Sequence, residues 1–165
     1  IENYLTSNSI QSDYIQMLGP LANRLIFEKV IINDKETHST EILPTENIKV
    51  TLIISCSGRI EYFRATLSIY KNGERLFTMQ DLLTPQPIDV GRFKSEFLIP
   101  KNLLRTGQHF ISAGGHDGNH LGMGTEWLYA SDITSFTIAE EFGSANDFAN
   151  EGLVNVPFNA TRIQL

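Results

Sequence analysis

Short stretches of this chain alternate between apolar and polar residues. In residues 92–99 the odd positions, which run from Phe93 to Ile99, are apolar or small, and most even positions are charged. This period of two predicts a strand with one buried side. A proline ends it, and a short leucine-anchored crossover leads into a second strand that begins at Gln108. We interpret these two strands as the central hairpin of a β-sandwich.

The same alternation recurs along the rest of the chain. It predicts strands over residues 23–33, 48–57, 61–70, 75–83, 125–129 and 132–140. Asn72-Gly73 supplies the positive φ angles of a tight hairpin turn. Loops or irregular edges are predicted for the proline-containing residues 42–47 and 84–90 and for the glycine-dense residues 114–124. About seven to nine short strands with almost no helix predict an all-β fold, an antiparallel immunoglobulin-like or jelly-roll-like β-sandwich.

The length indicates one domain with tails. A chain of 165 residues can bury a single core but is too short for two ordinary domains. We expect residues 1–20 to be a linker or N-terminal arm, residues 21–141 to be the sandwich, and residues 142–165 to be a C-terminal tail. Because the first residue is Ile1 and not Met, we expect the chain to be part of a longer protein.

Composition narrows the kind of partner. The formal net charge is -6 and the pI is near 5.2, which argues against a nucleic-acid backbone or an anionic membrane surface. No apolar run approaches the roughly 20 residues that a membrane span needs, and no signal-peptide pattern is present. Cys56 is the single cysteine, so no internal disulfide is possible, and its apolar neighbours predict a buried side chain.

Polar candidates for a site gather in the glycine-dense loop. His116, Asp117 and His120 form an H-D-x-x-H pattern, which in principle offers metal ligands. The surrounding glycines argue against a helix that would place both histidines on one face, so we expect neither a metal nor another cofactor. A mobile surface loop is one interpretation. The other is a ligand-contacting loop in which these three residues and Asn119 donate and accept hydrogen bonds.

Aromatic candidates flank that loop. Trp127 and Tyr129 follow it, and Tyr62 lies on the strand face opposite Phe63. An aromatic ring offers a flat apolar face to the C–H side of a sugar, and a tyrosine adds a polar tip. For Trp127, core packing is the competing interpretation.

Catalytic motifs are absent from the sequence. Glycoside hydrolysis needs two carboxylates held about 5 to 9.5 Å apart, and Asp117, Glu126 and Asp132 are candidates by residue type alone. The sequence has no G-x-S-x-G elbow, no cysteine with a plausible base, and no phosphate-binding loop. We therefore expect this chain not to be an enzyme, and a small glycan hydrolase or lyase using Asp117 and Glu126 is the least favoured alternative.

Several of these pieces, taken in order, resemble one family: the C-terminal carbohydrate-binding domain of the ATP-binding subunit (Wzt) of ABC exporters for bacterial O-antigen polysaccharide. The similarity spans roughly residues 24–158, and each piece alone is common in β-sandwiches. The order of the pieces carries the resemblance. They are the strand 25–32, the hairpin 69–73, Phe97-Leu98-Ile99-Pro100, Leu103-Leu104 with Gly107, Asp132-Ile133 with residues 136–138, and Gly152-Leu153-Val154 with Pro157.

The resemblance implies a function and partners. It implies a non-catalytic module that binds O-antigen polysaccharide, a homodimer that exchanges its C-terminal strand, and a place at the cytoplasmic face of the inner membrane beside a transmembrane exporter subunit. The nucleotide-binding domain would precede Ile1. The apolar Val154, Val156 and Phe158 alternate in the tail, which fits strand exchange and equally fits packing on its own domain.

The sugar-contacting residues do not carry over from the family, because they differ with the glycan. The candidate set therefore rests on chemistry and position: Tyr62, His116, Asp117, Asn119, His120, Trp127 and Tyr129. The alternative from another class is a structural or assembly β-sandwich, of the phage or surface-fibre type, whose exposed aromatics are interface residues.

Overall fold

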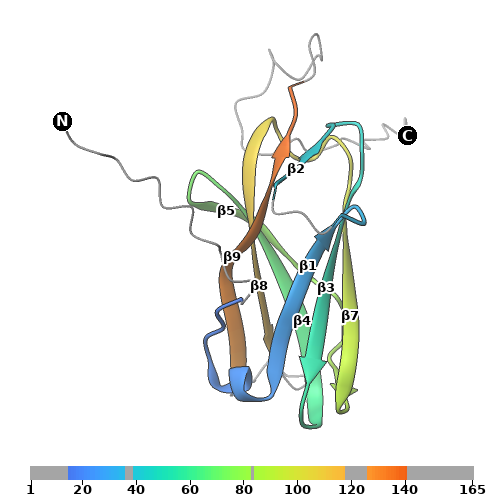
Figure 1. The fold of residues 1–165 in the computed structure, drawn as a ribbon, viewed down its shortest axis with the longest axis vertical. Helices are drawn as coiled ribbons and strands as arrows, with labels where there is room; N and C mark the ends of the chain where they lie inside the picture. The colour runs from blue at the N-terminus through green and yellow to red at the C-terminus, as the bar shows by residue number, and fades with distance from the viewer. Residues whose placement is uncertain (1–14, 36–38, 83, 118–125, 141–165) are drawn as a thin grey trace, which may run out of the picture.

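Two β-sheets pack face to face in the computed structural model, which describes residues 15–35, 39–82, 84–117 and 126–140 (Figure 1). The smaller sheet has the order β1 (Leu25–Ile32), β3 (Ile48–Cys56), β7 (Gly91–Ile99). The larger sheet has the order β2 (Ser39–Ile42), β9 (Trp127–Ile138), β8 (Gly107–His116), β4 (Ile60–Lys71), β5 (Glu74–Gln80), and β6 (Gln86–Ile88) pairs with β4. A turn of 3-10 helix, η1 (Pro20–Asn23), precedes β1. The predicted all-β sandwich is confirmed.

The core lies between the two sheets. On β3 the even positions point inward, and on β4 the odd positions from Phe63 to Ile69 do so, as the alternation predicts. Leu52, Leu67 and Ile69 are fully buried, and Phe136 of β9 joins the same cluster. Burying a side chain of this size contributes about 1.5–3 kcal/mol. Cys56 is 4% exposed, which confirms its predicted place in the core.

The turn between β4 and β5 is the one predicted from sequence. Asn72 has φ 52° and Gly73 has φ 78°, and Lys71 stands opposite Glu74 at the base of the turn. Two successive positive φ angles give a turn whose twist matches that of the flanking strands. The hairpin prediction is therefore confirmed.

The predicted central hairpin is wrong, although both of its strands exist. β7 pairs with β3, whereas β8 pairs with β4 and β9, so the two strands belong to different sheets. The connection must span the roughly 10 Å between packed sheets, and it buries Leu104 on the way. The leucine-anchored segment is thus a crossover between sheets, as its apolar side chain indicates.

Three further details differ from the prediction. β2 is an additional short strand that runs parallel to β9, so the larger sheet is mixed. The predicted strands 125–129 and 132–140 form one strand, β9, whose alternation is interrupted where Asp132 takes φ 46°. Gly114 and Gly115 belong to β8 and are buried, not part of a loop. Predictions for residues 1–14, 118–125 and 141–165 lie outside the described residues.

The segment before β1 lies against the first half of β9, on the edge that β2 covers only from Ser135 to Ile138. Leu18 exchanges two backbone hydrogen bonds with Tyr129, of 2.8 and 2.9 Å. Gly19 follows with φ 106°, and a Cβ there would lie 2.3 Å from the Trp127 carbonyl oxygen and 2.6 Å from its ring. Only glycine fits this approach. Residues 18 and 19 therefore fix the edge on which Trp127 stands.

Candidate functional site

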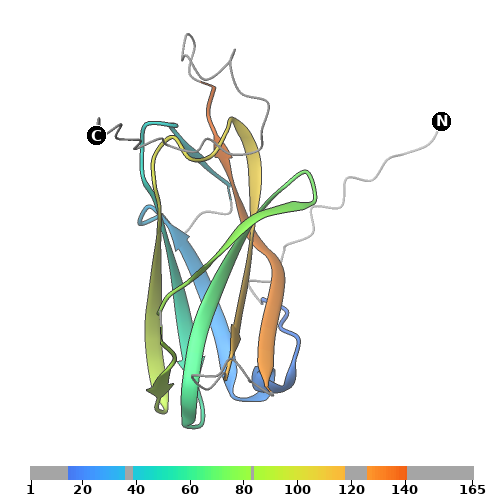
Figure 2. The ribbon, with the colours of Figure 1, turned by 180° about the vertical axis from the view of Figure 1, so that it is seen from behind.

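The outer face of the larger sheet carries most of the candidate residues. From Phe63 to Ile69 the odd-numbered side chains of β4 enter the core, so the even-numbered ones face outward. β8 and β9 contribute to the same face through the strand register. Figure 2 views the molecule from this side. We call this surface the aromatic face and define it by Tyr62, Arg64, Tyr70, Phe110, His116, Trp127 and Tyr129.

Strand pairing brings three of these side chains into one row. His116 of β8 stands opposite Arg64 of β4 on one side and opposite Trp127 of β9 on the other. The next outward row contains Tyr129, Gly114 and Thr66. Residues from three separate stretches of sequence therefore share one end of the sheet.

Trp127 and Tyr62 are the most exposed aromatic residues of the face. Trp127 is 49% exposed and Tyr62 is 48% exposed. One part of the Trp127 ring rests on Gly19. A half-exposed indole held against backbone is not a core residue, and its remaining surface is free to stack on a flat apolar group.

Tyr129 crosses β8 toward β4. A Cβ on Gly114 would lie 3.7 Å from Tyr129 Cδ2, so the Tyr129 ring lies within van der Waals reach of this position of β8. The hydrogen bond between the Tyr129 and Tyr70 side chains, followed by burial, raises the pKa of Tyr70 above its ordinary value. Tyr70 therefore stays protonated at neutral pH and its hydroxyl can both donate and accept.

His116 is a neutral hydrogen-bonding group. Burial lowers its pKa, and the positive charge of Arg64 lowers it further, while Asp117 opposes the shift. A neutral imidazole offers one donor and one acceptor. Because His116 stands opposite Trp127 in the strand register, the row combines a polar group with an aromatic one.

Asp117 has a structural role at the end of the β8–β9 pair. Its carboxylate accepts a hydrogen bond from the Glu126 backbone N–H at 3.1 Å, and its own N–H donates to the Glu126 carbonyl at 3.1 Å. Glu126 in turn pairs with Arg24. Both carboxylates named in the enzyme alternative thus hold partners of their own. Asn119 and His120 lie outside the described residues.

Three residues of the aromatic face were missed from the sequence: Arg64, Tyr70 and Phe110. The signal was available, because Arg64 and Tyr70 alternate with the buried positions of β4, and Phe110 alternates with Ile111 of β8. The same alternation predicts that all three side chains face outward.

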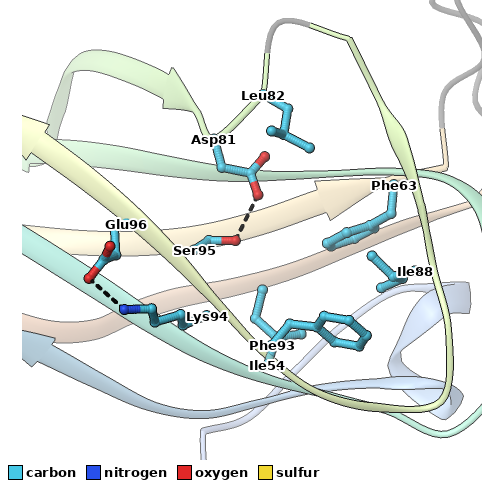
Figure 3. Close-up of a pocket in the computed structure, with 9 residues that line it drawn as sticks. All are labelled: Ile54, Phe63, Asp81, Leu82, Ile88, Phe93, Lys94, Ser95 and Glu96. Carbon is cyan, nitrogen blue, oxygen red and sulfur yellow. Dashed lines mark hydrogen bonds and ion pairs between the residues drawn. The ribbon is translucent and has the colours of Figure 1, made fainter.

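A cavity of about 250 Å³ opens at a different place, at the edge between β6 and β7 (Figure 3). Its inner wall is apolar and includes Ile54, Phe63, Ile88 and Phe93. The polar side chains of the cavity include Asp81 and Ser95, and Figure 3 shows the Asp81 carboxylate hydrogen-bonded to Ser95.

The polar groups of this cavity are already paired. The two oxygens of Asp81 accept from the Ala65 N–H at 3.0 Å and from Ser95 Oγ at 2.7 Å. Lys94 and Glu96 form an ion pair of 3.3 Å with each other. A sugar ring needs several convergent hydrogen-bonding groups, so the aromatic face suits it better than this cavity does.

Two other kinds of feature are absent from the part of the chain that the structure describes. Within it, no three histidine, cysteine, aspartate or glutamate side chains come together as metal ligands. No helix in those residues has the length and apolar character to cross a bilayer.

The fold and this face define a two-sheet β-sandwich domain with an aromatic outer surface. Among solved structures, that of the C-terminal domain of Wzt shares the fold, with a TM-score of 0.66 over 90% of this chain and 89% of that chain, at 12% sequence identity. The expected resemblance is thereby confirmed as a likeness of fold. The structure of chicken MD-1 complexed with lipid IVa aligns over 70% of this chain and 85% of that chain at 9% identity, and its TM-score of 0.34 is too low to indicate a shared fold. No family profile and no curated protein matches the sequence.

Proposed function

We propose that this chain is a non-catalytic carbohydrate-binding module that recognises O-antigen polysaccharide for export by an ABC transporter. The observation that carries the proposal is the row formed by Trp127, His116 and Arg64, with Tyr129 beside it, on an exposed sheet face. The likeness of fold to the C-terminal domain of Wzt supports the same function.

The chemistry of the face suits a neutral sugar chain. A pyranose ring presents C–H groups on its flat sides and hydroxyls at its rim. Trp127 and Tyr62 offer apolar planes at one end of the face, and His116 offers a neutral donor and acceptor in the row of Trp127. Tyr70, further along β4, adds a neutral hydroxyl. An open sheet face also accommodates a long polymer, which an enclosed pocket would not.

The same proposal places the module in a transporter. We infer a homodimer at the cytoplasmic face of the inner membrane, joined through the full-length protein to a nucleotide-binding domain and a transmembrane exporter subunit. Two copies of the face would bind one polysaccharide chain at two points. Modest affinity at each face would then suffice, because linked sites raise the effective concentration for the second contact.

Trp127 allows a direct test, because it is the single tryptophan of the chain. Titration with the O-polysaccharide of the source strain should shift the emission of Trp127 to shorter wavelength in a saturable way, since a stacked sugar displaces water from the half-exposed ring. An emission spectrum that stays unchanged while binding is seen by calorimetry would place the ligand elsewhere and would overturn the assignment of the face.

Replacing Tyr129 or Tyr62 by alanine should weaken binding about tenfold in each case, the loss typical of an interface residue worth more than 1 kcal/mol. Trp127 emission is the readout for both variants. The Trp127→Ala variant has no tryptophan, so its binding is measured by affinity electrophoresis. Leu98→Ala is the matched control, since Leu98 is 62% exposed on the smaller sheet and should have no effect. Equal losses in Leu98→Ala and Tyr129→Ala would contradict the proposal.

A further inference from the structure

A group of cationic and imidazole side chains lies at the end of the sandwich opposite to Trp127. The crossover from β7 enters β8 there, at the upper end in Figure 1. The group contains Lys71 at the end of β4, Arg105 in the crossover and His109 in β8. β8 begins at this end and finishes at His116, so the group lies about 30 Å from the row that contains Trp127.

Arg105 presents an unpaired edge. Its Nε and Nη2 atoms are buried and have no hydrogen-bond partner among the described residues. In a guanidinium group these two nitrogens lie on the same side, and their N–H bonds point in parallel. That edge can donate two parallel hydrogen bonds to the two oxygens of a carboxylate or phosphate. A buried donor without a partner costs about 1–3 kcal/mol, so two on one edge call for an explanation.

Lys71 adds a second positive charge close by. Its Nζ donates to the Thr106 carbonyl at 2.6 Å and lies 3.6 Å from the position of a Cβ on Gly107. Gly107 has φ 110°, a backbone conformation that favours glycine. Burial lowers the pKa of Lys71, and the charge of Arg105 lowers it further.

Nothing acidic in the described part of the chain neutralises these charges. None of the ion pairs there involves Lys71 or Arg105, and Glu74, which stands opposite Lys71 in the hairpin, forms no ion pair with it. His109 is fully buried, and its Nδ1–H donates to the Gly107 carbonyl at 3.0 Å. Burial first, and then the positive charge of Lys71, lower the pKa of His109 to about 4.

We propose that the Nε–Nη2 edge of Arg105, together with Lys71, is a binding site for an oxyanion, either a carboxylate or a phosphate group. A bidentate oxyanion satisfies both buried donors at once and neutralises the local charge. Two sources share this chemistry: a small free anion such as phosphate, and an acidic sugar of a glycan. The inference is independent of the aromatic face and of the proposed function.

The test follows the arginine Nε–H resonances of the whole chain by NMR, with added inorganic phosphate, glucuronate or neutral glucose at constant ionic strength. We expect the Arg105 resonance to move with an anion and to stay fixed with glucose. The exposed Arg75 serves as the internal control and should not move. Movement with phosphate alone identifies a phosphate site, and movement with glucuronate alone identifies a carboxylate sugar. An Arg105 resonance that neither anion displaces overturns the proposal.

Two variants make the assignment specific. Binding of phosphate or glucuronate to the variants is followed by calorimetry, because they lack the Arg105 Nε–H resonance. Arg105→Gln removes the charge and should abolish binding. Arg105→Lys keeps the charge but lacks the two-nitrogen edge, and should weaken anion binding about tenfold or more, as expected for the loss of a charge-assisted hydrogen bond. If Arg105→Gln does not fold, Arg105→Lys and the wild-type titration decide the matter. Undiminished binding in Arg105→Lys would show that only net charge is sensed and would overturn the bidentate site.

Discussion

Replacing Asp81 by alanine is expected to lower the free energy of unfolding by about 4 kcal/mol, since two hydrogen bonds to a charged carboxylate are lost at about 1.5–3 kcal/mol each. One partner is the N–H of Ala65, which is fully buried in the larger sheet, and the other is Ser95 of the smaller sheet. One carboxylate thus joins the two sheets at their open edge (Figure 3). Alanine would leave the Ala65 N–H buried and unpaired.

Urea unfolding of the variant measures this effect. Asp89→Ala is the matched control, because Asp89 is exposed and its ion pair with Arg59 is a surface contact, worth about 0–1 kcal/mol. Asp81→Asn should fall between the two, as it keeps one acceptor oxygen. If Asp81→Ala is no less stable than Asp89→Ala, the carboxylate does not join the sheets.

Lowering the pH from about 6.5 to about 4 should cost the fold about 3 kcal/mol through His109 alone, at 1.36 kcal/mol per pKa unit. The folded-state pKa of His109 is about 4, set first by burial and then by Lys71, whereas an unfolded histidine titrates near 6.5. Above pH 6.5 neither state binds the proton, so this group has no effect. Between the two values only the unfolded state binds it, and stability falls as the pH falls.

His109→Phe isolates this contribution, because phenylalanine can keep the stacking on Phe136, whose ring centroid lies 5.3 Å away. The variant should lose about 3 kcal/mol less than the wild type over the same pH range. Unfolding should be followed in solutions free of phosphate and carboxylate buffers, which are ligands of the proposed oxyanion site. Parallel loss of stability in both proteins would show that His109 titrates at its ordinary pKa.

Local alternation accounts for what the sequence could predict about the fold. The strands β3, β4 and β7 and the Asn72-Gly73 turn follow from the period of two and from a residue pair that tolerates positive φ. β2 could not be found this way, because it has four residues and its place depends on parallel pairing with β9. The prediction that β7 and β8 form a hairpin is wrong for the same reason, because the sheet to which a strand belongs depends on partners distant in sequence.

In the candidate site, too, some features follow from the local sequence and others depend on pairing between distant strands. Tyr62, Trp127 and Tyr129 could be named from residue type, and the structure places all three on the outer face of the larger sheet. The register that sets His116 between Arg64 and Trp127 is a property of pairing between strands and has no local signal.

Two structural contacts had no sequence signal at all. The carboxylate of Asp81 joins Ala65 to Ser95, residues that are 30 positions apart in the chain. The unpaired Nε–Nη2 edge of Arg105 depends on how the crossover packs against Lys71. Side-chain partners of this kind are fixed only when the two sheets come together.

The central claim is that the chain recognises a specific polysaccharide without catalysis. Affinity electrophoresis or calorimetry of the purified chain against the O-polysaccharide of its source strain, with an unrelated O-polysaccharide as control, tests it most directly. The account predicts selective, saturable binding of the strain's own polysaccharide with no change in its chain length. A folded chain that binds neither polysaccharide would contradict the account and would favour a structural or assembly role for the exposed aromatic residues.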